Sequence, residues 1–252
     1  ELVVGGRVGP FRPVTDPLAG RRARVEVQIM EQGQLRGIAG NDELPVVEDL
    51  AVGDIDGDGR AEILAVGWYR LWTLRLEEGE LVVVGEEALA TGRFSRVDAA
   101  DLDGDGRAEV VVAESLREPG AEVVTPAISV YSFAGQWQQV ARLDLEGDVG
   151  DLCLGELSKG QPSMALELGG EEVGGLVRLY DFNGFAPQLR HSQQVTQDHV
   201  RALNLELRRL AGRSLLAVGD IRGRIALLEP RGGKLVEAAI VAAPPGPLRG
   251  LH

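Results

Sequence analysis

The chain has 252 residues, of which 26 are basic and 39 acidic, giving a formal net charge of −13 at pH 7. This charge argues against a nucleic-acid or anionic-membrane partner, because both would repel the protein. Cys153 is the only cysteine, so no intrachain disulfide can form, and no apolar run approaches the ~18 residues that a membrane-spanning helix needs.

The N-terminal region has the pattern of strands joined by turns. The chain starts at Glu1 without an initiating Met or a signal-peptide pattern, so we expect a processed chain or one excised from a longer protein. ELVVGG at residues 1–6 matches EILAVG at residues 62–67, which places Glu1 where Glu62 falls. RARVEVQIM and LRGIAGN follow as two further predicted strands.

Residues 47–95 form the clearest repeat unit. VEDLAVGDI, EILAVGW, RLWTLRLE and LVVVGEEAL alternate with acidic or glycine-containing turns and predict four short strands. Four consecutive short strands of this kind are typical of one blade of a β-propeller.

Three further units repeat this order of strands at residues 96–146, 147–198 and 199–244. The PLRGLH segment at the C-terminus falls where a first strand begins, so residues 245–252 and 1–46 predict one composite blade closed by both termini. We therefore expect an all-β fold, a single β-propeller domain over residues 1–252 with five four-stranded blades. A partial ring cut from a larger propeller is the alternative. Cys153 lies in the apolar run DLCLG and is predicted to be a small buried core residue.

Two acidic loops carry the strongest chemical signal. Each has three Asp residues at alternate positions, followed by Gly and then by a Glu that begins an apolar strand. A hard cation with oxygen ligands would relieve the repulsion among these carboxylates, and calcium is the usual choice. Glycines in the loop allow a sharp turn that lets a carbonyl near Arg60 join the ligands. The expected ligands are Asp54, Asp56, Asp58 and Glu62 in one loop and Asp101, Asp103, Asp105 and Glu109 in the other.

The spacing differs from that of an EF-hand, whose loop ends in a bidentate Glu at its twelfth position. Ala65 and Val112 occupy the twelfth positions here, inside apolar strands. The alternative is an Asp/Gly turn without an ion. The corresponding loops of the third and fourth units, SKGQP and RRLAGR, have too few carboxylates for a calcium site.

The DxDGDGxxE motif and the apolar strand after it resemble the FG-GAP and VCBS repeat family, which includes the calcium-bearing blades of integrin α-chain propellers. The resemblance implies two calcium ions, with carbonyl oxygens of Arg60 and Arg107 added to the carboxylate ligands. Members of this family are mostly extracellular or surface-exposed, and they bind proteins or glycans. The resemblance therefore implies an extracellular or cell-surface protein with a protein or glycan partner, either alone or as part of a larger multidomain chain.

A partner is expected on the face opposite the acidic loops, where the connections vary more. Aromatic residues near one connection could stack on a sugar, although packing between blades is the alternative for them. The two histidines could contact a metal or a ligand, or could be exposed polar loop residues. The candidates for this face are Trp68, Tyr69, Trp72, Arg117, His191 and His199.

Motifs of known catalytic sites are absent from the sequence. It contains no G-x-S-x-G elbow, phosphate-binding loop or zinc-ligand spacing. The sequence therefore favours a non-catalytic calcium-binding scaffold. A polysaccharide-active lyase or hydrolase, or the accessory domain of one, is the alternative, because paired carboxylates are plentiful.

Overall fold

The computed structural model describes residues 2–8, 22–88, 93–117, 124–169, 175–195, 202–210, 212–220, 224–231 and 234–242. Over these ranges all regular elements are β-strands. The described residues include no helix that is long and apolar enough to cross a membrane.

The strands form five antiparallel sheets, in which each strand pairs with the next one along the chain. Four sheets have four strands, and the N-terminal sheet has three. The first two sheets contain β1 (Leu2–Val8), β2 (Arg22–Glu31) and β3 (Gln34–Asn41), then β4 (Asp49–Gly53), β5 (Glu62–Gly67), β6 (Arg70–Glu77) and β7 (Glu80–Ala88).

The other three sheets follow in the same way. They contain β8 (Arg93–Ala100), β9 (Glu109–Arg117), β10 (Val124–Phe133) and β11 (Trp137–Asp144), then β12 (Asp148–Ser158), β13 (Gln161–Gly169), β14 (Leu176–Asn183) and β15 (Ala186–Gln194), and finally β16 (Ala202–Leu210), β17 (Arg213–Asp220), β18 (Arg224–Arg231) and β19 (Lys234–Ala242).

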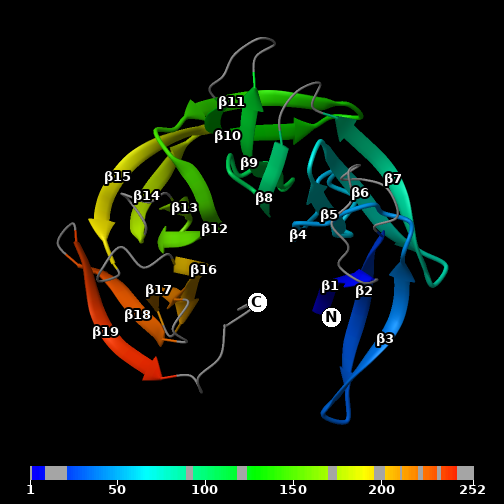
Figure 1. Cartoon of the computed structure of the whole chain (residues 1–252), viewed down its shortest axis with the longest axis horizontal. Helices are drawn as coiled ribbons and strands as arrows, with labels where there is room; N and C mark the ends of the chain where they lie inside the picture. Colours follow the sequence, from blue (N-terminus) through cyan, green and yellow to red (C-terminus); the bar gives the residue numbers. More distant parts are fainter. Residues whose placement is uncertain are drawn as a thin grey trace.

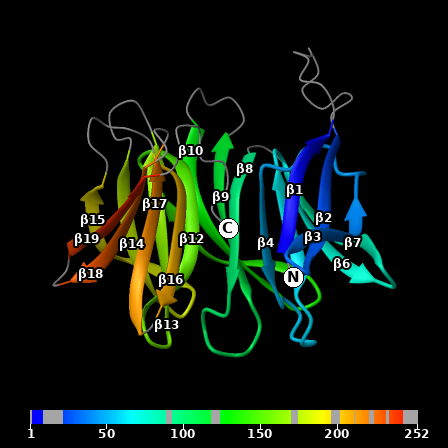
Figure 2. The same cartoon turned by 90° about the horizontal axis from the view of Figure 1, so that it is seen from below.

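The sheets are arranged as blades around a common centre (Figure 1). The first strands β4, β8, β12 and β16 lie innermost, and the last strands β7, β11, β15 and β19 lie on the rim (Figure 1). The prediction of an all-β, propeller-like fold is confirmed. The strands run between the two faces of the disc (Figure 2). We call the face that carries the first-to-second and third-to-fourth connections the loop face.

A repeated irregularity identifies the strands of the three-stranded sheet. In each four-stranded sheet the third and fourth strands are paired with one register shift, and β2 and β3 have the same kind of shift. β2 and β3 therefore correspond to third and fourth strands, and β1 to a second strand, as predicted from the match between ELVVGG and EILAVG. The shifts lie at Val27/Gln28, Thr73/Leu74, Val130/Tyr131, Leu179/Tyr180 and Leu227/Leu228.

Three details differ from the sequence prediction. β8 begins at Arg93, before the expected blade boundary at residue 96, because Arg93 and Phe94 pair with β9. The expected SKGQP loop is mostly strand, because Lys159 and Gly160 alone close the hairpin and Gly160 adopts a φ of 70°. β16 likewise extends to Leu210, into the segment expected to be a loop. The first strand predicted from PLRGLH lies outside the described residues.

The hydrophobic core is divided among the interfaces between neighbouring sheets. Four buried clusters join the five sheets in chain order. The second strand β5 is buried along its whole length, because a neighbouring sheet covers each of its faces. Cys153 is 4% exposed within the cluster between β12–β15 and β16–β19, which confirms its predicted place in the core. Burial raises the pKa of its thiol.

Partly buried aspartates connect the first strands of consecutive sheets. Each accepts a hydrogen bond from a backbone N–H in the first strand of the next sheet, which supplies a polar link between the two sheets. The three bonds run from Val97 N to Asp49 (3.0 Å), from Leu154 N to Asp98 (2.7 Å) and from Leu205 N to Asp151 (2.5 Å). Burial raises the pKa of Asp49 and of Asp98 to about 6.

Candidate metal centres

The first acidic loop connects β4 to β5 on the loop face, and its own carboxylates organise its backbone. Each Asp accepts hydrogen bonds from N–H groups two to five residues ahead, which curls the chain around the side chains. The bonds run to Asp54 from Gly57 N (2.8 Å) and Gly59 N (2.8 Å), to Asp56 from Asp58 N (3.1 Å), and to Asp58 from Arg60 N (2.8 Å). Gly57 and Gly59 adopt φ angles of 77° and 84°, which disfavour other residues.

The second loop connects β8 to β9 and repeats this network. Here the bonds run to Asp101 from Gly104 N (2.7 Å) and Gly106 N (3.0 Å), to Asp103 from Asp105 N (3.1 Å), and to Asp105 from Arg107 N (2.8 Å). The same backbone conformation therefore arises twice from the same residues at the same spacing.

A buried apolar residue anchors each loop to the core. Ile55 is 2% exposed and Leu102 is 4% exposed, although their neighbours in the loops are aspartates. Each lies in the cluster between its own sheet and the next one. The N–H of Ile55 donates to Glu62 (3.2 Å), and that of Leu102 donates to Glu109 (2.9 Å). The glutamates thus tie the start of each loop to its end.

Three acidic side chains converge on a common point in each loop. Carboxylate oxygens of Asp54, Asp56 and Asp58 lie within 4.8 Å of one another. Oxygens of Asp101, Asp103 and Glu109 do so in the second loop. A cluster of carboxylate oxygens suits a hard divalent cation such as calcium, so the residues present fit the ion that the motif implies. The sites carry the predicted residues, although Glu62 and Asp105 stand outside these two clusters. The carbonyl ligands at Arg60 and Arg107 stay predictions.

The two loops are in direct contact. The N–H of Ala108 in the second loop donates to the backbone carbonyl of Asp54 in the first (2.7 Å). The side chain of Arg107 lies against Gly57, where an added methyl group would come 3.0 Å from Arg107 Nε. A change in the backbone of one loop therefore acts on the other.

Arg75 enters the first centre from the neighbouring strand β6. Its Nε and Nη2 donate to the same oxygen of Glu62, at 3.0 and 2.8 Å, and Nη2 also donates to Asp56 at 2.5 Å. Glu62 is fully buried, and its hydrogen bond is the main cause of the raised pKa of Arg75. The sequence analysis missed Arg75. The signal that could have found it is an arginine between two leucines in the strand RLWTLRLE, at the position opposite Glu62 in the strand register.

The second centre has no such cation. Glu109 is 2% exposed, and the described residues supply no arginine or lysine to it. Burial raises the pKa of Glu109 to about 7, against the lowering effect of the Leu102 N–H, and the charges of Asp103, Asp105 and Asp101 raise it further. The centre thus concentrates negative charge that a bound cation would neutralise.

One segment of the chain, which holds both acidic loops, matches a known repeat. Residues 54–112 match an FG-GAP-like repeat. The match begins at the first aspartate of one loop and ends in the strand after the other, so both candidate centres lie within it. A comparison with curated proteins found no match. The FG-GAP-like repeat supports the predicted repeat family and a propeller scaffold.

The aromatic residues expected to face a partner mostly serve the blade interfaces. Trp72 is 4% exposed and packs in the cluster between β1–β3 and β4–β7, so its ring is not open to a surface ligand. Trp68 donates from Nε1 to Glu48 (2.9 Å), and its carbonyl accepts from Phe94 N (2.7 Å) in the next sheet. Tyr69 is 43% exposed and meets Trp68 edge to face, which leaves it as the accessible ring of the three.

The other residues predicted for that face are not brought together. His191 lies on β15, half-buried, with Nε2 2.9 Å from the side-chain oxygen of Gln193. Arg117 is the last residue of β9, and His199 lies outside the described residues.

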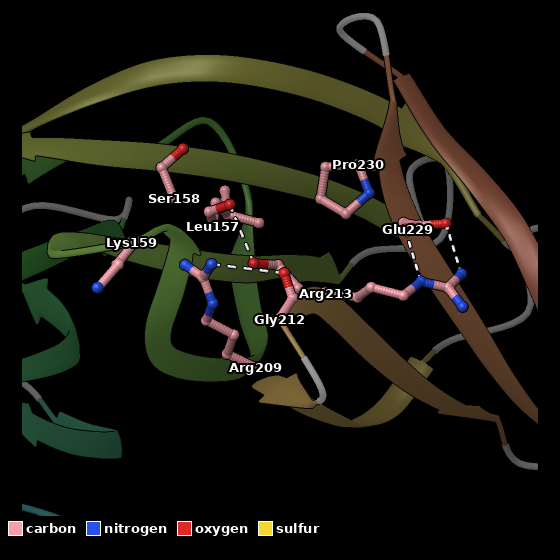
Figure 3. A pocket seen from close by; sticks show the side chains of 9 residues that line it. Leu157, Ser158, Lys159, Arg209, Gly212, Arg213, Glu229 and Pro230 are labelled. Carbon is pink, nitrogen blue, oxygen red and sulfur yellow. Dashed lines mark hydrogen bonds and ion pairs between the residues drawn. The ribbon is translucent and has the colours of Figure 1, made fainter.

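A basic pocket lies on the loop face, beside the turns that replace acidic loops in the last two sheets. It has a volume of about 240 Å³ and is open to solvent. Lys159 and Arg209 line it, and among the described residues neither has a carboxylate partner, whereas Arg213 pairs with Glu229 (2.8 Å) (Figure 3). The pocket can therefore receive a carboxylate or another anionic group. The sequence analysis missed it, because the register of the turns brings together residues from two units.

Proposed function

We propose that this chain is a non-catalytic calcium-binding propeller scaffold that presents a surface to a protein or glycan partner at the cell exterior. The duplicated loop carries this proposal, because its carboxylate oxygens converge within 4.8 Å in both copies. The match of residues 54–112 to an FG-GAP-like repeat supports the same role.

Calcium has a structural role in this proposal. Asp54, Asp56 and Asp58 would hold one ion, and Asp101, Asp103 and Glu109 the other. Bound calcium supplies positive charge to carboxylates that otherwise repel one another. The loops would then hold Ile55 and Leu102 in the clusters between sheets, so calcium would stabilise the contacts between blades.

The partly buried aspartates between the sheets support a non-catalytic role. Asp49, Asp98 and Asp151 have raised pKa values, which often mark catalytic groups. Each of them accepts a backbone hydrogen bond from the next sheet instead. Burial at the sheet interfaces raises their pKa values, and the backbone hydrogen bonds partly lower them again, so a structural role accounts for the shifts.

Calcium-dependent stability tests the scaffold. We expect wild type to melt at a higher temperature in millimolar calcium than in chelator, because calcium binds the folded loops. Each site would add about 2.7 kcal/mol at 100-fold saturation. Asp103→Asn should reduce the calcium-dependent rise. Asp42→Asn, which changes an exposed residue remote from both loops, is the control and should retain the full rise. An unchanged rise in Asp103→Asn would contradict the proposed site.

The basic pocket is the described surface that we propose for the partner. Lys159 and Arg209 would pair with carboxylates of a uronic-acid glycan or an acidic peptide. On an array of uronate oligosaccharides and acidic peptides, we expect wild type to bind and Lys159→Glu with Arg209→Glu to lose most of that binding. Arg36→Glu, an exposed change on β3, is the control. Equal binding by the double variant, or no binding by wild type, would contradict this assignment.

A further inference from the structure

The two candidate centres differ at one position on the strand beside them. β5 and β6 pair Ile63 with Leu74, so Glu62 faces the position of Arg75. β9 and β10 pair Val110 with Tyr131, so Glu109 faces the position of Ser132. The first centre therefore has an arginine where the second has a serine.

Arg75 already forms ion pairs with two carboxylates of the first centre. Its guanidinium bridges Glu62 and Asp56, and Glu62 has no exposed surface. A calcium ion that used these oxygens would have to displace Arg75 or accept its positive charge a few ångströms away. Either event opposes calcium binding, because like charges at short range repel strongly inside a protein.

Among the residues that the structure describes, no cation neutralises the charge of the second centre. Glu109 is 2% exposed and points toward Asp101 and Asp103, with carboxylate oxygens of all three within 4.8 Å. One oxygen of Glu109 accepts from Leu102 N, and no described arginine, lysine or histidine pairs with this residue. A buried carboxylate without a cationic partner is costly, so this centre gains most from a cation taken from solution.

We propose that the two centres bind calcium unequally, with the second filled first and the first restrained by Arg75. This inference rests on the proposed calcium role. Arg75 acts as a built-in cation that holds the first loop in place when calcium is absent. Ser132 leaves the second loop dependent on calcium. Arg75 is thus a residue that determines calcium affinity without being a ligand.

Exchanging the two residues tests the inference in both directions. In calorimetric titrations with calcium alone, wild type should show one tight and one weaker site. Arg75→Ser should tighten the weaker site by about tenfold or more, because it removes a unit charge from the ion's surroundings. Ser132→Arg should weaken the tight site by a similar factor. Asp103→Asn combined with Arg75→Ser isolates the first centre and assigns the change to it.

Thermal melts supply a second readout that does not depend on the titration. In chelator, Arg75→Ser should melt below wild type, because Glu62 is left buried without a cation. Millimolar calcium should restore most of this loss. Ser132→Arg should instead melt at or above wild type in chelator and respond less to calcium. Should Arg75→Ser fail to fold in chelator, its recovery by calcium is the expected result, and Ser132→Arg tests the second centre.

The outcomes separate the inference from the function on which it rests. No calcium binding by wild type or by Arg75→Ser would overturn the proposed calcium role and this inference with it. Two sites of equal affinity, unchanged by Arg75→Ser and Ser132→Arg, would overturn the inference alone. Failure of calcium to restore Arg75→Ser would also overturn it.

Discussion

Asp49, Asp98 and Asp151 are acidic groups that the fold keeps largely out of contact with solvent. Each receives one backbone hydrogen bond from the neighbouring sheet, which partly offsets the cost of burying its charge. Asp151 also pairs with Arg96 at 3.2 Å, whereas no described cation forms an ion pair with Asp49 or Asp98. Ionisation of these two residues therefore opposes folding.

Substitution of Asp49 should change how stability depends on pH. Its pKa is about 6 in the folded protein, against an ordinary value of 3.8, so the folded chain binds more protons between these values. Stability should fall as the pH rises from about 4 to about 6. Asp49→Asn should make this fall shallower, measured by urea unfolding at several pH values in chelator. A fall as steep in Asp49→Asn as in the control Asp42→Asn would contradict this assignment.

Individual residues show what the sequence could and could not predict about the site. The alternating aspartates were predictable as a cluster, because the repeated spacing leaves few other roles for them. The role of Arg75 was not predictable, because its contact with Glu62 depends on the register between β5 and β6. Trp72 was predicted as part of a sugar-stacking surface, but it and its neighbours Leu71 and Thr73 are buried, because neighbouring sheets cover both faces of this part of β6.

At the scale of elements, the connection between the first and second strands of a sheet has two forms. In the sheets β4–β7 and β8–β11 it is an acidic loop whose own carboxylates bind its backbone. In β12–β15 the strands instead extend into a tight hairpin closed by Gly160. The sequence SKGQP predicted the loss of carboxylates. It did not predict the longer strands, because strand length depends on the backbone pairing across the hairpin.

The turns between third and fourth strands were more predictable. Glu78 and Gly79 adopt φ angles of 51° and 88°, and Gln32 and Gly33 adopt 52° and 81°. Positive φ at both central residues matches the right-handed twist of a two-residue hairpin. A polar residue followed by Gly between two apolar runs is typical of such a turn, and the strands predicted on either side left both segments as connections.

At the scale of the whole molecule, the repeat determines the fold. The register shift between the last two strands recurs in all five sheets, including the three-stranded one. The sequence predicted this arrangement because each unit repeats the same order of strands and turns. The register shifts themselves leave no such pattern in the sequence, since the one extra residue that causes a shift resembles its neighbours in the strand.

The loop face has two chemically different parts. Acidic loops occupy it in the sheets β4–β7 and β8–β11, whereas the basic pocket occupies it near β12–β13 and β16–β17. Calcium would reduce the negative charge of the first part and leave the second unchanged. A partner that carries carboxylates would therefore meet less repulsion from the calcium-loaded protein.

The number of calcium ions bound per chain tests the central claim most directly. Equilibrium dialysis of the wild-type protein against increasing calcium counts the ions without relying on a change in structure. We predict two ions per chain, one bound at low calcium concentration and the other only at a higher concentration. No ion bound at millimolar calcium would contradict the account, and the acidic loops would then be turns held together by their own hydrogen bonds.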